Sequence, residues 1–187
     1  MDVVRELLRL KNFPKDAMKS NGVTALGIAA YQGSIEMMQA LVDGGCDIKH
    51  TNNQGIGPMF MAIKSNQIDS IRFLLGKQLP VWLKGQAHSR DNSPVFYAIR
   101  QRNMAALELF ADRNTEEMNH AVDSHGSNVI MYAASVGNFD AVNYLSVRGV
   151  KLDVEDREGK TLVMRILMAD LYDLASKLIS RGADINF

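Results

Sequence analysis

The sequence predicts an all-α solenoid in which short helix pairs stack on one another. The first observation is an internal repeat, because related segments begin at Gly22, Gly55, Asp91, Gly126 and Gly159, at steps of 33, 36, 35 and 33 residues. A near-constant period of this length is typical of repeat proteins, in which each unit packs only on its neighbours. The second observation is that the segments contain two stretches with helical spacing of apolar residues, separated by a turn.

The first helix of a unit carries start and stop signals. Thr24 is a good N-cap residue, and Pro58 and Pro94 stand one position later in their units, where a first-turn residue needs no N–H group. Gly33 and Gly137 are typical of the residue that ends a helix. We therefore expect each first helix to lie between these two signals.

The second helix of a unit is amphipathic. Its apolar residues recur at helical spacing and so form one stripe: Ile35, Met38, Leu41 and Val42 in one unit, and Ile68, Ile71, Leu74 and Leu75 in the next. Gly45, Gly149 and Gly182 follow such stretches and are expected to end them.

Two short motifs connect these units with a known family. Residues 24–26, 57–59 and 93–95 read T-A-L, G-P-M and S-P-V, and residues 182–186 read G-A-D-I-N. The chain resembles the ankyrin repeat family, whose unit has about 33 residues, a β-turn and two helices, and a T-P-L-H-x-A signature. The resemblance covers nearly the whole chain. It implies a single ankyrin repeat domain over residues 1–187, an all-α ankyrin-repeat solenoid of helix-turn-helix units with short β-turn or hairpin fingers.

The resemblance also divides the chain into an N-terminal half repeat, 1–21, and five repeats, 22–54, 55–90, 91–125, 126–158 and 159–187. The third repeat is atypical, because Asp91 replaces its initial Gly and Arg102 replaces the Gly that ends the first helix. No unit has His after the T-P-L equivalent. Extra residues fall near 78–87 and 115–121, in connections, where insertions in a repeat protein usually lie.

The C-terminal repeat keeps its apolar residues. Leu162, Leu167, Leu171, Leu174 and Leu178 are not replaced by polar residues, although a terminal repeat needs a polar outer face for solubility. We therefore expect an uncapped end and a natural protein that continues with more repeats or another domain.

Composition narrows the functional class. The 187 residues include 21 Lys and Arg and 21 Asp and Glu, so the net charge of +0 disfavours nucleic-acid binding. A lone cysteine, Cys46, excludes an intrachain disulfide and favours the interior of the cell. No apolar run approaches the length of about 20 residues that spans a bilayer, so direct membrane insertion is not expected. We expect a cytoplasmic protein, with a nuclear location also open.

The resemblance implies that partners bind at the finger tips and the exposed side of the first helices. Carried onto this sequence, the partner-binding positions are Tyr31, Gln32, Asn53, Gln54, Ile56, Lys64, Arg90, Asn92, Arg100, Gln101, Ser124, His125, Arg157 and Glu158. Lys64, Arg90 and Arg100 make the middle of this surface basic, whereas Glu155, Asp156 and Glu158 are expected to make the last finger acidic. Because arginine binds carboxylates with two hydrogen bonds, we expect a protein or peptide with an acidic segment across the second and third repeats.

Other residue types give weaker signals. The histidines, His50, His88, His120 and His125, lack a compact ligand pattern, so we expect no metal site and no cofactor. Cys46 takes the place of a packed small residue, so we expect an inert, buried thiol and no catalytic residue. Most of the 11 methionines are expected to fill the core, with Met168 as the exception. Trp82, in a longer connection, fits either local core or a partner contact.

The preferred interpretation is a monomeric, non-enzymatic protein–protein interaction module that serves as a scaffold, adaptor or recruitment surface. The alternative is a regulatory ankyrin segment of a larger intracellular enzyme or channel, acting in cis. An independent hydrolase or metalloenzyme has no support beyond scattered histidines.

Overall fold

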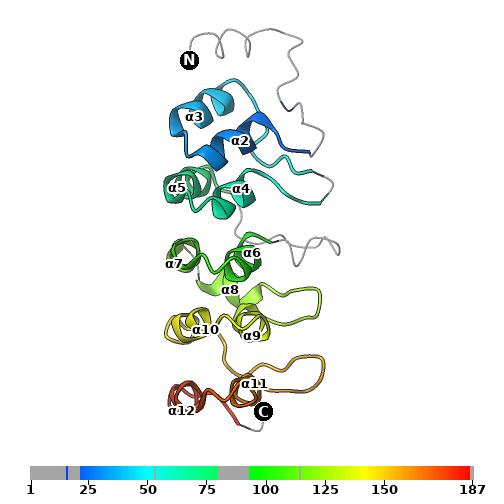
Figure 1. Ribbon diagram of the computed structural model, residues 1–187, viewed down its shortest axis with the longest axis vertical. Helices are drawn as coiled ribbons and strands as arrows, with labels where there is room; N and C mark the ends of the chain where they lie inside the picture. Colours follow the sequence, from blue (N-terminus) through cyan, green and yellow to red (C-terminus); the bar gives the residue numbers. More distant parts are fainter. Residues whose placement is uncertain (1–15, 17–21, 53, 80–92, 114, 186–187) are drawn as a thin grey trace. The chain divides into compact units, whose positions relative to one another are not determined.

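The computed structural model describes residue 16 and residues 22–52, 54–79, 93–113 and 115–185, which form two compact units, Met1–Val81 and Trp82–Phe187 (Figure 1). Most of the half repeat 1–21, together with Asn53, Trp82, Arg90 and Asn92, lies outside these described residues. Regular structure in the described ranges is almost entirely helical. None of the helices in those ranges is both long and apolar enough to cross a membrane.

The first unit contains two helix pairs: α2 (Ala25–Gln32) with α3 (Ile35–Asp43), and α4 (Pro58–Lys64) with α5 (Ile68–Gly76). Within each pair the helices pack on each other, and α2 also packs on α4 and α3 on α5. Two successive repeats are therefore stacked in register.

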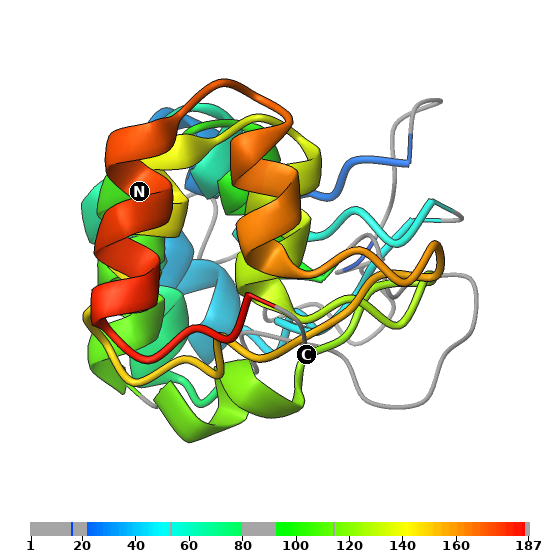
Figure 2. The same ribbon diagram turned by 90° about the horizontal axis from the view of Figure 1, so that it is seen from below.

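The second unit continues the same pattern through three pairs. These are α6 (Pro94–Arg100) with α7 (Met104–Arg113), α9 (Val129–Ser135) with α10 (Phe139–Ser146), and α11 (Leu162–Leu167) with α12 (Tyr172–Ser180). The first helices α6, α9 and α11 pack in one layer and the second helices α7, α10 and α12 in another (Figure 2). The extra residues expected near 115–121 form a short helix, α8 (Thr115–His120).

Side-chain caps explain where several first helices begin. The Thr24 hydroxyl accepts a hydrogen bond from the Gly27 N–H at 3.1 Å, and Asn128 and Thr161 cap α9 and α11 in the same way. Pro58 and Pro94 occupy the first positions of α4 and α6. The helix starts predicted at Thr24, Pro58 and Pro94 are confirmed.

The turn after each first helix requires a left-handed residue. Gly33 and Gly137 adopt φ 76° and 69°, as the sequence predicted. Asn66, Arg102 and Asp170 take the equivalent places with φ 55°, 54° and 57°, a conformation that costs a non-glycine residue energy. Arg102 offsets part of this cost, because its Nη2 donates a hydrogen bond to the Gly137 carbonyl at 2.9 Å.

The core of the second unit lies between the two helix layers. Phe96 packs edge-on against Tyr132, with ring centroids 4.9 Å apart. Asn138, which is buried, joins two repeats, since its side chain donates to the Ile99 carbonyl at 2.8 Å and accepts from the Ala141 N–H at 3.2 Å. This side chain therefore caps α10 and also adds a hydrogen bond to a carbonyl of α6.

Predictions about core residue types also hold. Cys46 is buried, and Met38, Met59, Met118 and Met131 fill the core, whereas Met168 is exposed.

Candidate partner-binding surface

The fingers are tight turns held by one acidic or amide side chain. In the second unit, Asp123 Oδ1 accepts hydrogen bonds from the His125 and Ser127 N–H groups, both at 2.8 Å. A single antiparallel bridge between Val122 and Asn128 closes this finger. The tip is therefore presented on a defined turn, consistent with the hairpin fingers predicted from the sequence.

The next finger repeats this geometry. Asp156 Oδ1 accepts from the Glu158 N–H at 2.8 Å and the Lys160 N–H at 3.0 Å, and Glu155 bridges Thr161. Asn52 Oδ1 does the same in the first unit, with Gln54 and Ile56 as donors at 2.9 Å. Such side-chain bonds to nearby backbone amides stabilise a turn locally.

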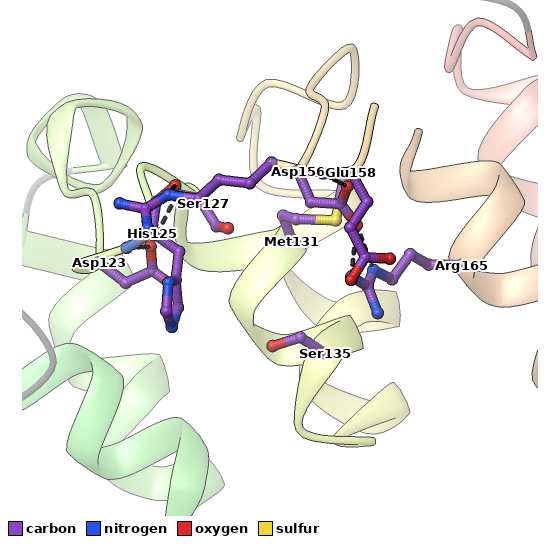
Figure 3. A pocket seen from close by; sticks show the side chains of 9 residues that line it. Asp123, His125, Ser127, Met131, Ser135, Asp156, Glu158 and Arg165 are labelled. Carbon is purple, nitrogen blue, oxygen red and sulfur yellow. Dashed lines mark hydrogen bonds and ion pairs between the residues drawn. The ribbon is translucent and has the colours of Figure 1, made fainter. Parts of the chain in front are cut away.

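A cavity of about 330 Å³ lies between these two fingers, Val122–Asn128 and Glu155–Thr161, and the helices α9 and α11 (Figure 3). Its lining consists of Asp123, His125, Ser127, Met131, Ser135, Asp156, Arg157, Glu158 and Arg165. All of these residues are charged or polar except Met131.

An ion pair forms one wall of the cavity. Arg165, on α11, donates from Nε to Asp156 Oδ2 at 2.6 Å, and its Nη2 also contacts this oxygen. The side chain of Asp156 is only 7% exposed and that of Arg165 28% exposed. Burial raises the pKa of Asp156, but hydrogen bonds from the Lys160 N–H, the Arg165 side chain and the Glu158 N–H outweigh it, so the pKa falls below its ordinary value.

The preceding finger lacks this ion pair. Tyr132 occupies the place of Arg165 in its repeat, and no salt bridge to Asp123 occurs among the described residues. Asp123 is nevertheless buried and holds its turn through backbone donors alone. The two fingers thus have the same turn geometry, but only the aspartate of the second finger forms an ion pair among the described residues.

Arg157 connects the two fingers by hydrogen bonds. Its Nε donates to the His125 carbonyl at 2.9 Å and its Nη2 to the Ser124 carbonyl at 2.5 Å. Glu158, at the tip, pairs with Lys160 at 2.7 Å, and that hydrogen bond lowers the pKa of Glu158. The last finger is less acidic than its sequence suggests, because Arg165 and Lys160 compensate Asp156 and Glu158.

The structure brings three of the predicted contact residues, His125, Arg157 and Glu158, together around the cavity. Arg100 and Gln101 are exposed at the end of α6 and do not line it, and Ser124 is half-buried beside it. In the first unit Tyr31, Gln32, Gln54 and Lys64 are exposed and Ile56 is half-buried. The predicted contacts at Asn53, Arg90 and Asn92 fall outside the described residues.

Sequence reasoning missed the residues that shape the cavity. Asp123 and Ser127 were not singled out, and Asp156 was interpreted as an exposed acid, although it is buried in a hydrogen-bonded turn. One available signal was an Asn or Asp three residues before a finger glycine, as at Asp156 and Gly159. The other was Arg165, which interrupts a column otherwise made of apolar and aromatic residues, such as Met61.

Within the described ranges, no group of three or more His, Cys, Asp or Glu side chains could hold a metal ion. His50, His120 and His125 lie in these ranges, and His88 does not.

Comparison with known proteins identifies the family. A family model described as ankyrin repeats, in three copies, matches residues 1–84 and again residues 95–187. The chain belongs to the ankyrin repeat family. Ankyrin repeats generally mediate protein–protein interactions and generally lack enzymatic activity. The helix pairs and fingers described above are therefore ankyrin repeats.

Several relatives are much longer proteins. The human transient receptor potential cation channel subfamily A member 1 is 25% identical over 67% of this chain and 11% of its own length. The L-asparaginase of Dirofilaria immitis is 22% identical over 83% of the chain and 26% of its own length. The human neurogenic locus notch homolog protein 2 is 25% identical over 73% of the chain and 5% of its own length. The ankyrin chain thus spans about a quarter or less of these relatives.

Proposed function

We propose that this ankyrin chain is a non-enzymatic module, inside the cell, that scaffolds or recruits a protein partner through its finger tips and first helices. The observation that supports this proposal most directly is the cavity of the second unit, where two fingers and two first helices surround a shared volume. The hydrogen bonds of Arg157 and the Asp156–Arg165 ion pair hold the residues around the cavity in place. These side chains therefore lose little conformational entropy when a partner binds.

The chemistry of the cavity suits side chains of a protein partner. Its volume of about 330 Å³ is at the small end for an organic ligand site, and its lining is more polar than such sites usually are. The exposed His125 and Glu158 offer hydrogen bonds at the rim.

An acidic segment is the proposed partner chemistry. Arg100 is exposed at the end of α6, where its guanidinium lies 5.2 Å from the centroid of the Tyr97 ring. The aromatic ring positions the guanidinium while leaving it exposed, so it can form paired hydrogen bonds with a carboxylate. Arg90, close in sequence, adds positive charge, whereas Lys64 belongs to the other unit.

The test is affinity capture from native lysate with the chain and with an Arg90→Glu/Arg100→Glu variant, followed by mass spectrometry. A matched control is Arg72→Glu, a charge reversal at an exposed position of the second helix α5. We expect a protein retained by the parent chain and the control and lost by the double variant. Equal retention by all three would contradict a role for these arginines.

A second candidate function is regulation in cis within a larger enzyme or channel. One relative is a cation channel, and the segment of it that matches this chain makes up only 11% of the channel's length. This observation favours the second candidate. Recovery of the complete reading frame tests this alternative, because a frame without a catalytic or channel domain would exclude it.

A further inference from the structure

The cavity of the second unit contains a buried carboxylate with one oxygen that has no partner. Asp123, which holds the turn of the finger Val122–Asn128, is only 3% exposed. Its Oδ1 accepts from the His125 and Ser127 N–H groups, whereas Oδ2 accepts no hydrogen bond and joins no ion pair among the described residues. A buried carboxylate oxygen normally has a partner, because burial removes the water that would otherwise stabilise its charge.

This oxygen is accessible from the cavity. The fully enclosed side-chain oxygens without a partner in the described ranges are Ser70 Oγ and the Tyr144 hydroxyl, and Asp123 Oδ2 is not one of them. Asp123 lines the cavity, and Figure 3 shows it beside His125 on one side, with Arg165 on the opposite side. A group that enters the cavity can therefore reach the free oxygen.

The next repeat shows which partner such a carboxylate takes. Asp156 holds its turn through Oδ1 in the same way, and its Oδ2 accepts a hydrogen bond from the guanidinium of Arg165, with Nε at 2.6 Å. In the repeat of Asp123 the position of Arg165 is taken by Tyr132, whose ring packs against Phe96. The finger of Asp123 thus has the carboxylate of a guanidinium site without the arginine.

The rest of the lining also favours a hydrogen-bond donor as the ligand. Ser135 Oγ donates its proton to the Tyr132 carbonyl at 2.8 Å, so only its lone pairs are left for a ligand. Arg157 donates to backbone carbonyls of one finger and Arg165 to the carboxylate of the other, so neither guanidinium pairs with Asp123. The acceptors that remain suit a cation with several N–H groups.

We propose that the cavity takes an arginine side chain of the protein partner, whose guanidinium pairs with Asp123 Oδ2. The partner then supplies from outside the contact that Arg165 makes with Asp156 within the chain. A guanidinium suits this site because its planar fork of N–H groups matches a carboxylate and keeps its charge at any ordinary pH. The inference rests on the proposed function, since it names the partner's chemistry at the cavity. It is separate from the acidic segment proposed for Arg100, which does not line the cavity.

The test is a ¹H–¹⁵N NMR titration of the chain with Nα-acetyl-arginine N-methylamide, up to about 50 mM at constant ionic strength. We expect the amide signals of His125 and Ser127, which donate to Asp123, to shift with a Kd of about 1 to 10 mM. The citrulline counterpart has nearly the same shape but no charge, so it should bind at least about tenfold more weakly.

The variant is Asp123→Asn, which removes the charge and keeps the turn, since Asn52 holds the equivalent turn of the first unit through its Oδ1. We expect it to bind the arginine probe at least about tenfold more weakly, a loss of about 1.4 kcal/mol. The matched control is Asp140→Asn, the same change of charge at an exposed position of α10 that does not line the cavity. The control should bind the probe as the parent chain does.

Three outcomes would overturn the proposal: no shift over the whole range, an equal response to the citrulline probe, or equal binding by Asp123→Asn and the parent. The first two need only the parent chain, so they apply even if the variant does not fold. The titration and the lysate capture are also read separately. A chain that binds the arginine probe but retains no protein contradicts recruitment alone, whereas a chain that retains a protein but does not bind the probe contradicts this inference alone.

Discussion

Removal of the Asp156 carboxylate tests whether the buried ion pair and the finger turn stabilise the second unit. The Asp156→Ala substitution deletes two backbone hydrogen bonds, from Glu158 and Lys160, and the contacts with Arg165. Breaking a buried ion pair costs about 3 to 5 kcal/mol, and the partial exposure of Arg165 places this case at the lower end. We expect the free energy of unfolding of the second unit to fall by about 3 kcal/mol.

The measurement is urea denaturation followed by circular dichroism at the helical band, with hydrogen exchange on peptides from residues 150–180 to localise the loss. A double-mutant cycle with Asp156→Asn and Arg165→Met isolates the ion pair from the turn, since methionine is the natural residue at the equivalent position, Met61. The cycle is expected to give a coupling energy of about 1 to 2 kcal/mol.

Asp123→Ala serves as the internal comparison, because Asp123 holds the same turn without a salt bridge among the described residues. We expect it to cost about half as much as Asp156→Ala, because only backbone hydrogen bonds are lost. An Asp156→Ala chain within about 1 kcal/mol of the parent, or equal costs at the two aspartates, would refute the reasoning.

Three further predictions concern single side chains. Asn138→Ala should lower the free energy of unfolding by about 2 kcal/mol in urea denaturation, because it removes the cap of α10 and the side-chain hydrogen bond to the Ile99 carbonyl; a loss below about 0.5 kcal/mol would contradict this. Ser70→Ala should stabilise the first unit by about 1 kcal/mol in the same assay, because the fully buried Ser70 hydroxyl has no hydrogen-bond partner among the described residues; a destabilised variant would show that it has one. Asp156 should also make stability acid-sensitive: its folded pKa is below the ordinary value of 3.8, so its contribution is present above that pH and is lost as the pH falls below it. Melting temperatures from about pH 6 to pH 3 should therefore fall more steeply for the parent than for Asp156→Asn, and parallel curves would argue against this origin.

The helix boundaries could be predicted because their signals are local. Thr24, Pro58 and Pro94 act on N–H groups within one turn, and Gly33 adopts the backbone conformation that ends its helix. The non-glycine turn at Arg102 was harder to predict, because its compensating hydrogen bond goes to Gly137, in the next repeat.

The candidate site was predicted in part. The tip positions His125, Arg157 and Glu158 follow from the repeat register, and the structure brings them together around one cavity. Their roles were not predictable, since Arg157 meets the carbonyls of a finger more than 30 residues earlier in the chain.

The sequence by itself determined the family, the period and the helix pairs, because apolar spacing, caps and glycine turns act over a few neighbouring residues. Only the tertiary structure decided which charges remain available at the surface. Asp156 looks like an exposed acid in the sequence, yet the folded finger turn brings two backbone amides, and its packing on α11 brings Arg165, to the carboxylate. The stacking of one repeat on the next likewise decides which apolar residues are buried.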